Sequence, residues 1–178
     1  MFIKRVIRAL LLDPELYEEV EQDKSAIWQA VVVVFLASLA RGIYTYKTGD
    51  YRGLILGTIT SFVLWILLAF LIYIIGTKLF PESETRTDQG ELMRVLGFAS
   101  APGIFRVFAV VHWLTPYVLL FVWLWTLVAM IIGVRQALDY KSTWRAVGVC
   151  LIGFVVYFVI FFLIFWIFGI KPPVETGA

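Results

Sequence analysis

Three residues inside or beside the third long apolar stretch could contact a charged ligand. Arg106 stands within the apolar run 92–111, Arg94 stands near the start of that run, and His112 follows it. An arginine at the bilayer centre costs about 2.5–3.5 kcal/mol to insert, so it normally has a role or a route to the interface. Two interpretations of Arg106 stay open: a side chain that reaches the headgroups, and a buried cation that meets an anionic ligand. His112, next to Trp113, is more typical of an interfacial residue.

The groups needed for catalysis or metal binding are not clustered anywhere in the sequence. Cys150 is the one cysteine and His112 the one histidine, so an internal disulfide and a histidine metal cluster are both excluded. Glu18 and Glu19 are adjacent, but they lie on a charged segment before the first apolar run, and no later run supplies a histidine. We therefore expect no enzyme activity, no cofactor, no metal and no nucleic-acid partner.

The apolar stretches define the fold class. Hydrophobic residues make up 61% of the 178, and the mean hydropathy is +0.90. A helical span of a bilayer needs roughly 20 apolar residues. Stretches of about this length, none with an Asp or Glu, occur at 27–46, 54–75, 92–111, 117–134 and 147–170. The sequence predicts an all-α polytopic membrane protein, with five transmembrane helices in a domain that covers residues 25–171.

The distribution of basic residues predicts the orientation. With five spans, ten of the 15 Lys and Arg residues fall on the side of the N-terminus and five on the other side. Cytoplasmic connections carry the excess of positive charge, so we expect the N-terminus in the cytoplasm and the C-terminus outside. Arg8 interrupts any early apolar core, so no cleavable signal peptide is expected.

Residues 1–24 are predicted to form a cytoplasmic segment of two helices. In the first, Phe2, Val6 and Leu10 share one row, and basic residues occupy the other flank. Asp13-Pro14 is a helix-start signal, and the helix that it begins is acidic. Two interpretations stay open: a membrane-surface anchor followed by a solvated acidic face, and a docking surface for a basic partner. Residues 172–178 are expected to be a short tail.

The third apolar run holds a pattern of small residues around a proline. Gly97 and Ala101 lie on one helical face, as do Ala99 and Gly103, and such pairs allow helices to approach closely in lipid. Pro102 lacks a backbone donor, so the helix is expected to kink or break there. The segment is predicted either to be a kinked packing helix or to line a ligand.

Three short motifs resemble the YIP1 family, whose members carry a Yip1 domain. Leu-Gly-Phe-Ala-Ser-Ala-Pro at 96–102 is similar to the family's Gly-aromatic-x-x-x-Pro signature, with Phe98 in place of the commoner Tyr, and Glu91 and Arg94 are similar to its lead-in. Leu-Asp-Pro-Glu-Leu-Tyr at 12–17 resembles the Asp-Pro start of prokaryotic members. The stretch 133–146, with Asp139, Tyr140 and Arg145-Ala146, resembles their fourth connection.

The resemblance implies a five-helix bundle with a cytoplasmic N-terminus. For eukaryotic relatives it implies vesicle traffic at the Golgi and endoplasmic reticulum, association with small Rab-type GTPases, and association with each other. The sequence lacks the Asp-Leu-Tyr-Gly-Pro motif and the long N-terminal region of those relatives, which makes GTPase association doubtful. We expect a bacterial or archaeal plasma-membrane protein; the Golgi or endoplasmic reticulum would be the alternative in a eukaryote.

The expected function is that of a non-enzymatic membrane protein that organises partners or lipids as an adaptor or scaffold. Its partners would be the lipid bilayer and either a membrane protein or further copies of itself. Gly97, Phe98, Ala101, Pro102 and Gly103 would shape the helix interface or hinge. The alternative is a small transporter or channel subunit with a proline-broken third helix, in which Arg106 contacts an anion.

Overall fold

The computed structural model describes residues 1–46, 51–83, 85 and 87–167, and the described residues form helices and no strands. Five helical segments are long and apolar enough to span a membrane. They are built from α3 (Ala26–Thr45), α4 (Tyr51–Ile74) with the π-helix η2 (Ile75–Leu79), α5 (Gln89–Ala99) with the 3₁₀-helix η3 (Ala101–Val110), α6 (Thr115–Ala137) preceded by the short η4 (His112–Leu114), and α7 (Thr143–Ile167).

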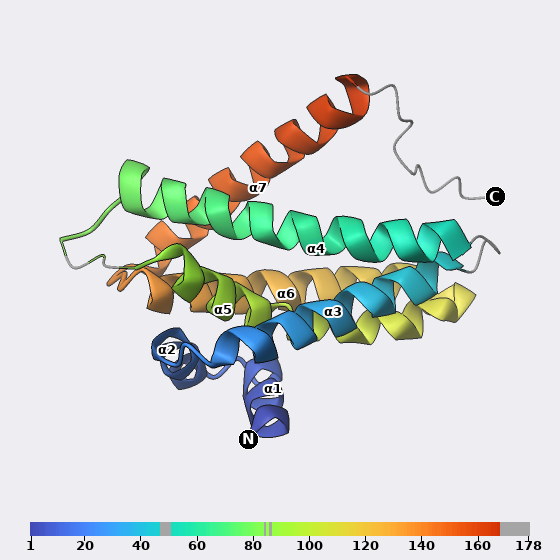
Figure 1. Ribbon diagram of the computed structural model, residues 1–178, viewed down its shortest axis with the longest axis horizontal. Coiled ribbons are helices and arrows are strands. Elements are labelled where there is room, and N and C mark those ends of the chain that lie inside the picture. Colours follow the sequence, from blue (N-terminus) through green and yellow to red (C-terminus); the bar gives the residue numbers. More distant parts are fainter. Residues whose placement is uncertain (47–50, 84, 86, 168–178) are drawn as a thin grey trace.

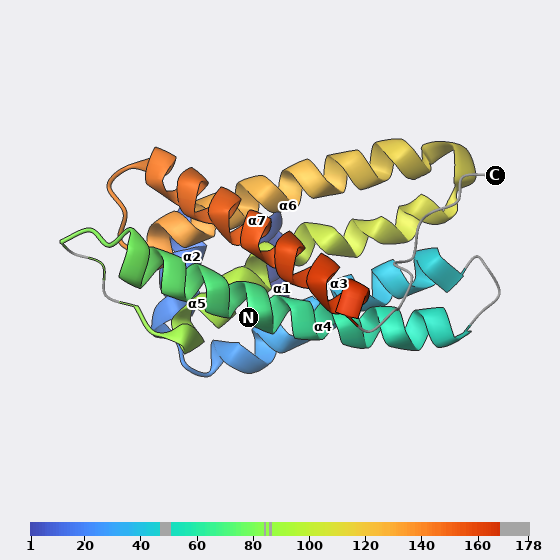
Figure 2. The ribbon, with the colours of Figure 1, turned by 90° about the horizontal axis from the view of Figure 1, so that it is seen from above.

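Four of these spans run along the long axis of the molecule, and α7 leaves them at an angle (Figure 1). Two short N-terminal helices, α1 (Phe2–Leu10) and α2 (Pro14–Gln22), lie against one side of the bundle. The view from above shows α7 crossing over α4 (Figure 2). We name the two ends of the bundle by their elements. The α2 end holds α2, the start of α5, the end of α6 and the start of α7. The far end holds the end of α3, the start of α4 and η4.

Exposed aromatic residues mark both ends of the spans. Trp28 and Trp144 are exposed at the α2 end, and Tyr46, Trp113 and Tyr117 are exposed at the far end. Trp28 and Tyr46 are 18 positions apart along α3 and its cap, which corresponds to about 27 Å at the rise of an α-helix. This is close to the thickness of the hydrocarbon core, about 30 Å. The two groups therefore suit the aromatic belts of a membrane protein.

The third span changes its helix type and does not simply kink. The hydroxyl of Ser100 donates to the carbonyl of Gly97 at 2.6 Å, and the Ser100 amide donates to Leu96 at 3.1 Å, which ends α5. Pro102 then falls in the first turn of η3, where its missing donor costs nothing. Ten residues of 3₁₀-helix exceed the usual three or four. The kink or break expected near Pro102 takes the form of a switch from α to 3₁₀ geometry.

The observed spans differ from the predicted ranges mainly at their ends. The second begins at Tyr51 and continues through η2 to Leu79, and the third and fifth begin at Gln89 and Thr143. Helix ends are capped by polar residues that hydropathy does not register: Asp88 and Glu91 form a capping box at the start of α5. The last predicted positions of the fifth span, 168–170, and the tail 172–178 lie outside the described residues.

Candidate functional site

The N-terminal helices are joined to each other by ion pairs. The Arg5 guanidinium lies 2.8 Å from the Glu19 carboxylate and 2.8 Å from that of Asp23, although the Arg5 side chain is only 5% exposed. Arg8 pairs with Asp13 at 2.6 Å and also bonds Glu19. Charge-assisted bonds of this kind are stronger than neutral ones. Arg5 and Arg8 therefore pair with Asp13, Glu19 and Asp23 within the chain.

These ion pairs also set the protonation of the acids. The hydrogen bond from Arg8 holds the pKa of Asp13 below its usual value, and the bonds from Arg5 and Arg8 do the same for the pKa of Glu19. The pKa of Asp23 is lowered by hydrogen bonds from Ser25 and Arg5. These three carboxylates are thus partly exposed and paired within the chain.

Helix α2 is packed into the bundle. Leu16, Tyr17 and Val20 are fully buried. Asp13 caps the helix by accepting from the Glu15 amide at 3.1 Å, and Leu12 before it has φ of 60°, which turns the chain sharply between the two helices. The hydrophobic face of α2 therefore belongs to the core of the membrane domain.

Arg94 fastens α2 to α5. Its side chain is buried, and its Nε donates to the carbonyl of Val20 at 2.9 Å while Nη2 donates to the carbonyl of Glu21. Both carbonyls belong to the last turn of α2, where backbone acceptors have no partner within the helix. A cation at the C-terminus of a helix is also favoured by the helix dipole. Arg94, a candidate ligand contact from the sequence, is thus engaged with α2.

The three segments that resemble the YIP1 family meet at Gly133 of α6. A Cβ added at Gly133 would lie 2.7 Å from Cγ1 of Val95 and 3.4 Å from Cδ1 of Tyr17. These neighbours come from α5 and α2 respectively. The absence of a side chain at this position allows three elements to approach closely. The motifs are therefore parts of one packed site at the α2 end.

At the α2 end, the connection after η2 and the connection after α6 are joined by hydrogen bonds from side-chain hydroxyls to backbone carbonyls. The Tyr140 hydroxyl donates towards the carbonyls of Gly76 at 3.0 Å and Phe80 at 2.7 Å, at the end of η2. The Thr85 hydroxyl bonds the carbonyl of Leu138 at 3.0 Å. Unpaired carbonyls at a helix end need such donors, so Tyr140 fixes the end of the second span to the connection after α6.

Helix α1 lies across the long axis of the bundle (Figure 1) and reaches the level of its middle. Nε1 of Trp125, about halfway along α6, donates to the carbonyl of Leu10 at 3.1 Å. On the other flank of α1, Ile3 and Ile7 are exposed, as is Leu11 just after it. Because this level lies between the two groups of exposed aromatic residues, we expect these apolar side chains to face acyl chains.

The small residues of the third span contact α3. A Cβ at Gly97 would lie 2.6 Å from Cβ of Ala30, and one at Gly103 would lie 3.0 Å from Cβ of Ala37. The remaining members of the predicted interface are all buried: Phe98, Ala101 and Pro102. Gly97 and Gly103 therefore lie in the contact between α3 and the third span.

Arg106 and His112 lie apart from the α2 end. The side chain of Arg106 folds back, so that its Nη1 lies 2.8 Å from where a Cβ of Gly103 would stand. Helical side chains lean towards the N-terminus, and here this direction leads away from the far end. The guanidinium therefore lies beside Gly103, at the contact with α3. His112 is exposed beside Trp113 at the far end.

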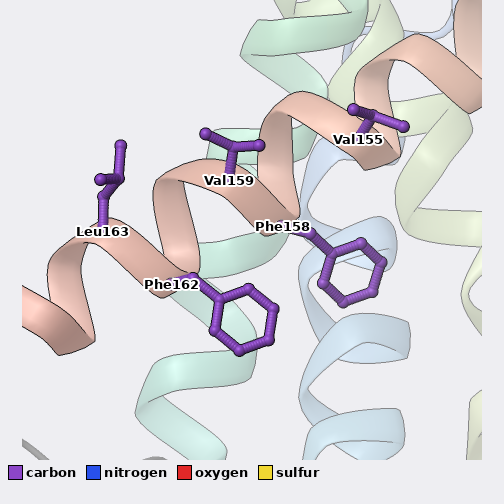
Figure 3. Close-up of a pocket in the computed structure, with 5 residues that line it drawn as sticks. All are labelled: Val155, Phe158, Val159, Phe162 and Leu163. Atoms are coloured by element: carbon purple, nitrogen blue, oxygen red, sulfur yellow. The ribbon is translucent and has the colours of Figure 1, made fainter.

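Two surface grooves of the described residues are apolar. One lies between η3 and α6 and is lined by Phe105, Phe108, Tyr117, Val118, Phe121 and Val122. The other lies on α7, where Phe158 and Phe162 project to one side and Val155, Val159 and Leu163 to another (Figure 3). Neither groove offers a charged group, and both suit acyl chains. Among the described residues no group of three His, Cys, Asp or Glu side chains could hold a metal.

Sequence reasoning missed three residues that hold the α2 end together: Arg5, Tyr17 and Tyr140. The sequence pattern of α1 predicts Arg5 on the polar flank of the helix, whereas its side chain is buried. A signal was available, because α1 is basic, α2 is acidic, and only a short turn separates the two helices. The two tyrosines stand in motifs that resemble the family, but their partners lie 60 or more positions away.

Comparison with known proteins agrees with this arrangement. The family model described as Yip1 domain matches residues 8–164, a range that begins within α1 and ends within α7. Searches of curated proteins and of solved structures give no match. The matched range includes all three motifs that meet at the α2 end, and the chain therefore belongs to the YIP1 family.

Proposed function

We propose that this protein is a non-enzymatic membrane adaptor whose α2 end faces the cytoplasm and recruits a protein partner with a basic surface. The proposal rests on one observation: Arg94 donates hydrogen bonds to the carbonyls of Val20 and Glu21 in the last turn of α2. We call this pair of hydrogen bonds the Arg94 clamp. A helix held by its backbone in this way keeps its outer side chains at fixed positions, and fixed groups lose less entropy when they bind.

The charge of the outer face supports a basic partner. Glu15 and Glu18 of α2 are exposed, and Glu18 accepts a hydrogen bond of 2.7 Å from the side-chain amide of Gln136. Glu19 of the same helix is paired with Arg5 and Arg8. Complementary charge steers partners and sets specificity. The membrane would be the plasma membrane of a bacterium or archaeon, with the basic connections inside.

Transport is a second candidate, and one observation favours it. Within the described residues, Arg106 has no hydrogen bond or ion pair although it lies inside a span. Intramembrane charges often mark ion pathways. Flux of a small anion into proteoliposomes, lost in Arg106→Gln with an intact fold, would establish this function, and absence of flux in the parent protein would exclude it.

The adaptor proposal is tested by extraction in native lipid nanodiscs and mass spectrometry of the bound proteins. Deleting residues 1–24 would not be a clean variant, because it also removes the carbonyls that Arg94 binds. The double substitution Glu15→Gln and Glu18→Gln removes two exposed negative charges and leaves the clamp in place. The matched control, Ser83→Lys with Thr143→Lys, changes the net charge equally at exposed sites of the same end.

We expect a stoichiometric partner that the parent and the control retain and the glutamine variant loses. A partner retained by all three proteins would contradict the acidic docking face. The absence of any stoichiometric partner from the parent would contradict the adaptor function itself.

A further inference from the structure

The guanidinium of Arg106 is a set of hydrogen-bond donors without an acceptor in the described part of the chain. Arginine carries five N–H donors and remains charged at any accessible pH. The residue is only partly exposed and stands in a span, about 8 Å before the end of η3 at the rise of a 3₁₀-helix. An unpaired charge in such surroundings is costly, and a bound anion would remove the cost.

The guanidinium of Arg106 lies in a small gap beside Gly103 and Ala37, which we call the notch. Gly103 leaves the space that Nη1 of Arg106 occupies, since a Cβ there would stand 2.8 Å away from it. The same Cβ would stand 3.0 Å from Cβ of Ala37, so the opposite wall of the notch is a small residue of α3. Two small residues therefore keep the charge at the contact between α3 and η3.

A second cation lies on the same face of α3. Arg41 follows Ala37 by one helical turn, is exposed, and is near enough for its charge to act on Arg106. Tyr157 of α7 is within the same range of Arg41. Like charges repel, and an anion beside Arg106 would be attracted by both guanidinium groups.

We propose that Arg106 and Arg41 bind a phosphate group at the contact between α3 and η3, in the half of the membrane nearer the far end. Planar guanidinium forks match the oxygens of phosphate, and two of them make a chelating pair. Phosphate is also the anion that the membrane interface itself supplies. The group enters from the side on which Arg41 is exposed, and belongs either to an anionic phospholipid or to free phosphate. The site is independent of the proposed docking face at the α2 end.

The test uses the full chain in nanodiscs with two probes. The first probe is phosphatidylglycerol added to phosphatidylcholine, with bound lipid counted by native mass spectrometry. The second is inorganic phosphate added to nanodiscs of phosphatidylcholine alone, with binding measured as a rise in Tm. Retention of phosphatidylglycerol identifies a lipid headgroup as the ligand, and a response to phosphate alone identifies the free anion.

In either case Arg106→Gln should weaken binding about tenfold, the loss of one charge-assisted hydrogen-bonded contact. Arg106→Lys should recover part of the affinity, because lysine restores the positive charge but lacks the planar pair of N–H donors of a guanidinium. The control Arg145→Gln, at the α2 end, should bind as the parent does. Gly103→Ala tests the notch without altering charge and should weaken binding by displacing the guanidinium. A parent that binds neither probe, or Arg106→Gln and Gly103→Ala variants that bind like the parent, would overturn the proposal.

Discussion

Nε of Arg94 donates a hydrogen bond of 2.9 Å to the carbonyl of Val20, which is 74 positions away in the chain. This bond places a buried cation of the third span under the last turn of an N-terminal helix. The N-terminal segment is consequently a structural part of the membrane domain. Its stability and its accessibility should therefore depend on residues deep in the bundle.

Removing this clamp should loosen α2. Arg94→Gln loses charged donors to two carbonyls and is expected to lower the free energy of unfolding by about 3 kcal/mol. Thermal unfolding in detergent and trypsin cleavage at Lys24 measure the two effects, and cleavage should become faster. Arg145→Gln, which removes an exposed ion pair with Glu82, should cost no more than about 1 kcal/mol. Equal effects of the two substitutions would argue against the clamp.

Close packing between α5 and α3 should make Gly97 intolerant of a side chain. Gly97→Ala places a Cβ 2.6 Å from Cβ of Ala30, and overpacking of this kind is expected to cost about 1–3 kcal/mol. Gly148 of α7 is the matched control, because a Cβ there meets nothing within 4 Å. Gly148→Ala should be neutral or stabilising by up to about 1 kcal/mol. Thermal unfolding compares the two, and a tolerated Gly97→Ala would show that the helices are further apart.

Glu21 should make stability depend on pH near neutrality. Burial, followed by the charges of Asp139 and Glu91, raises its pKa to about 7, and Arg94 opposes this. Between the unfolded value of about 4.5 and the folded value of about 7, the folded protein binds more protons than the unfolded one. The free energy of unfolding therefore falls as pH rises through this window.

Glu21→Gln should remove that dependence and raise stability at pH 8 by about 1 kcal/mol, a value reduced for partial exposure. The Tm of parent and variant between pH 5.5 and 8 measures it, with Glu15→Gln as an exposed control. The lowered pKa values of Asp13 and Glu19 act in the opposite sense and at lower pH, where protonation breaks their ion pairs. Parallel Tm curves for the parent and Glu21→Gln would refute the assignment.

The exposed flank of α1 should contact lipid. A spin label at Ile7→Cys, in a Cys150→Ala background, is expected to be accessible to oxygen dissolved in the bilayer and shielded from a water-soluble nickel relaxant. A label at Glu15→Cys should show the reverse. If position 7 were accessible to the nickel reagent, α1 would lie in water and not among acyl chains.

Much of the architecture was predictable from the sequence. Runs of apolar residues without acids specify spans, and Asp13-Pro14 specifies the start of α2, because these are local properties of the chain. The 3₁₀ geometry after Ser100 and the π-helix at Ile75 were not predictable. Helix types of similar energy are selected by tertiary packing. Here η3 packs against α3 and η2 is bonded by Tyr140, and both contacts join residues far apart in the sequence.

The candidate site was predicted in part. Gly97 and Gly103 were recognised as contact residues because small-residue spacing has a direct physical meaning in lipid. Arg94 was singled out as a possible ligand contact, whereas the structure shows a clamp; its partners are backbone carbonyls, which have no sequence signature. The same limit applies to Arg5, whose burial depends on the turn at Leu12 that returns α2 to its side.

The central claim is that α2 is part of the folded bundle and presents its acidic face to the cytoplasm. It is tested most directly by labelling single cysteines with a membrane-impermeant maleimide in inside-out and right-side-out vesicles, in the Cys150→Ala background. Glu15→Cys should react only in inside-out vesicles, and Val20→Cys, fully buried, should react in neither until the protein is denatured. Labelling of position 15 from the outside would reverse the orientation, and labelling of position 20 in the native protein would show that α2 is not packed into the bundle.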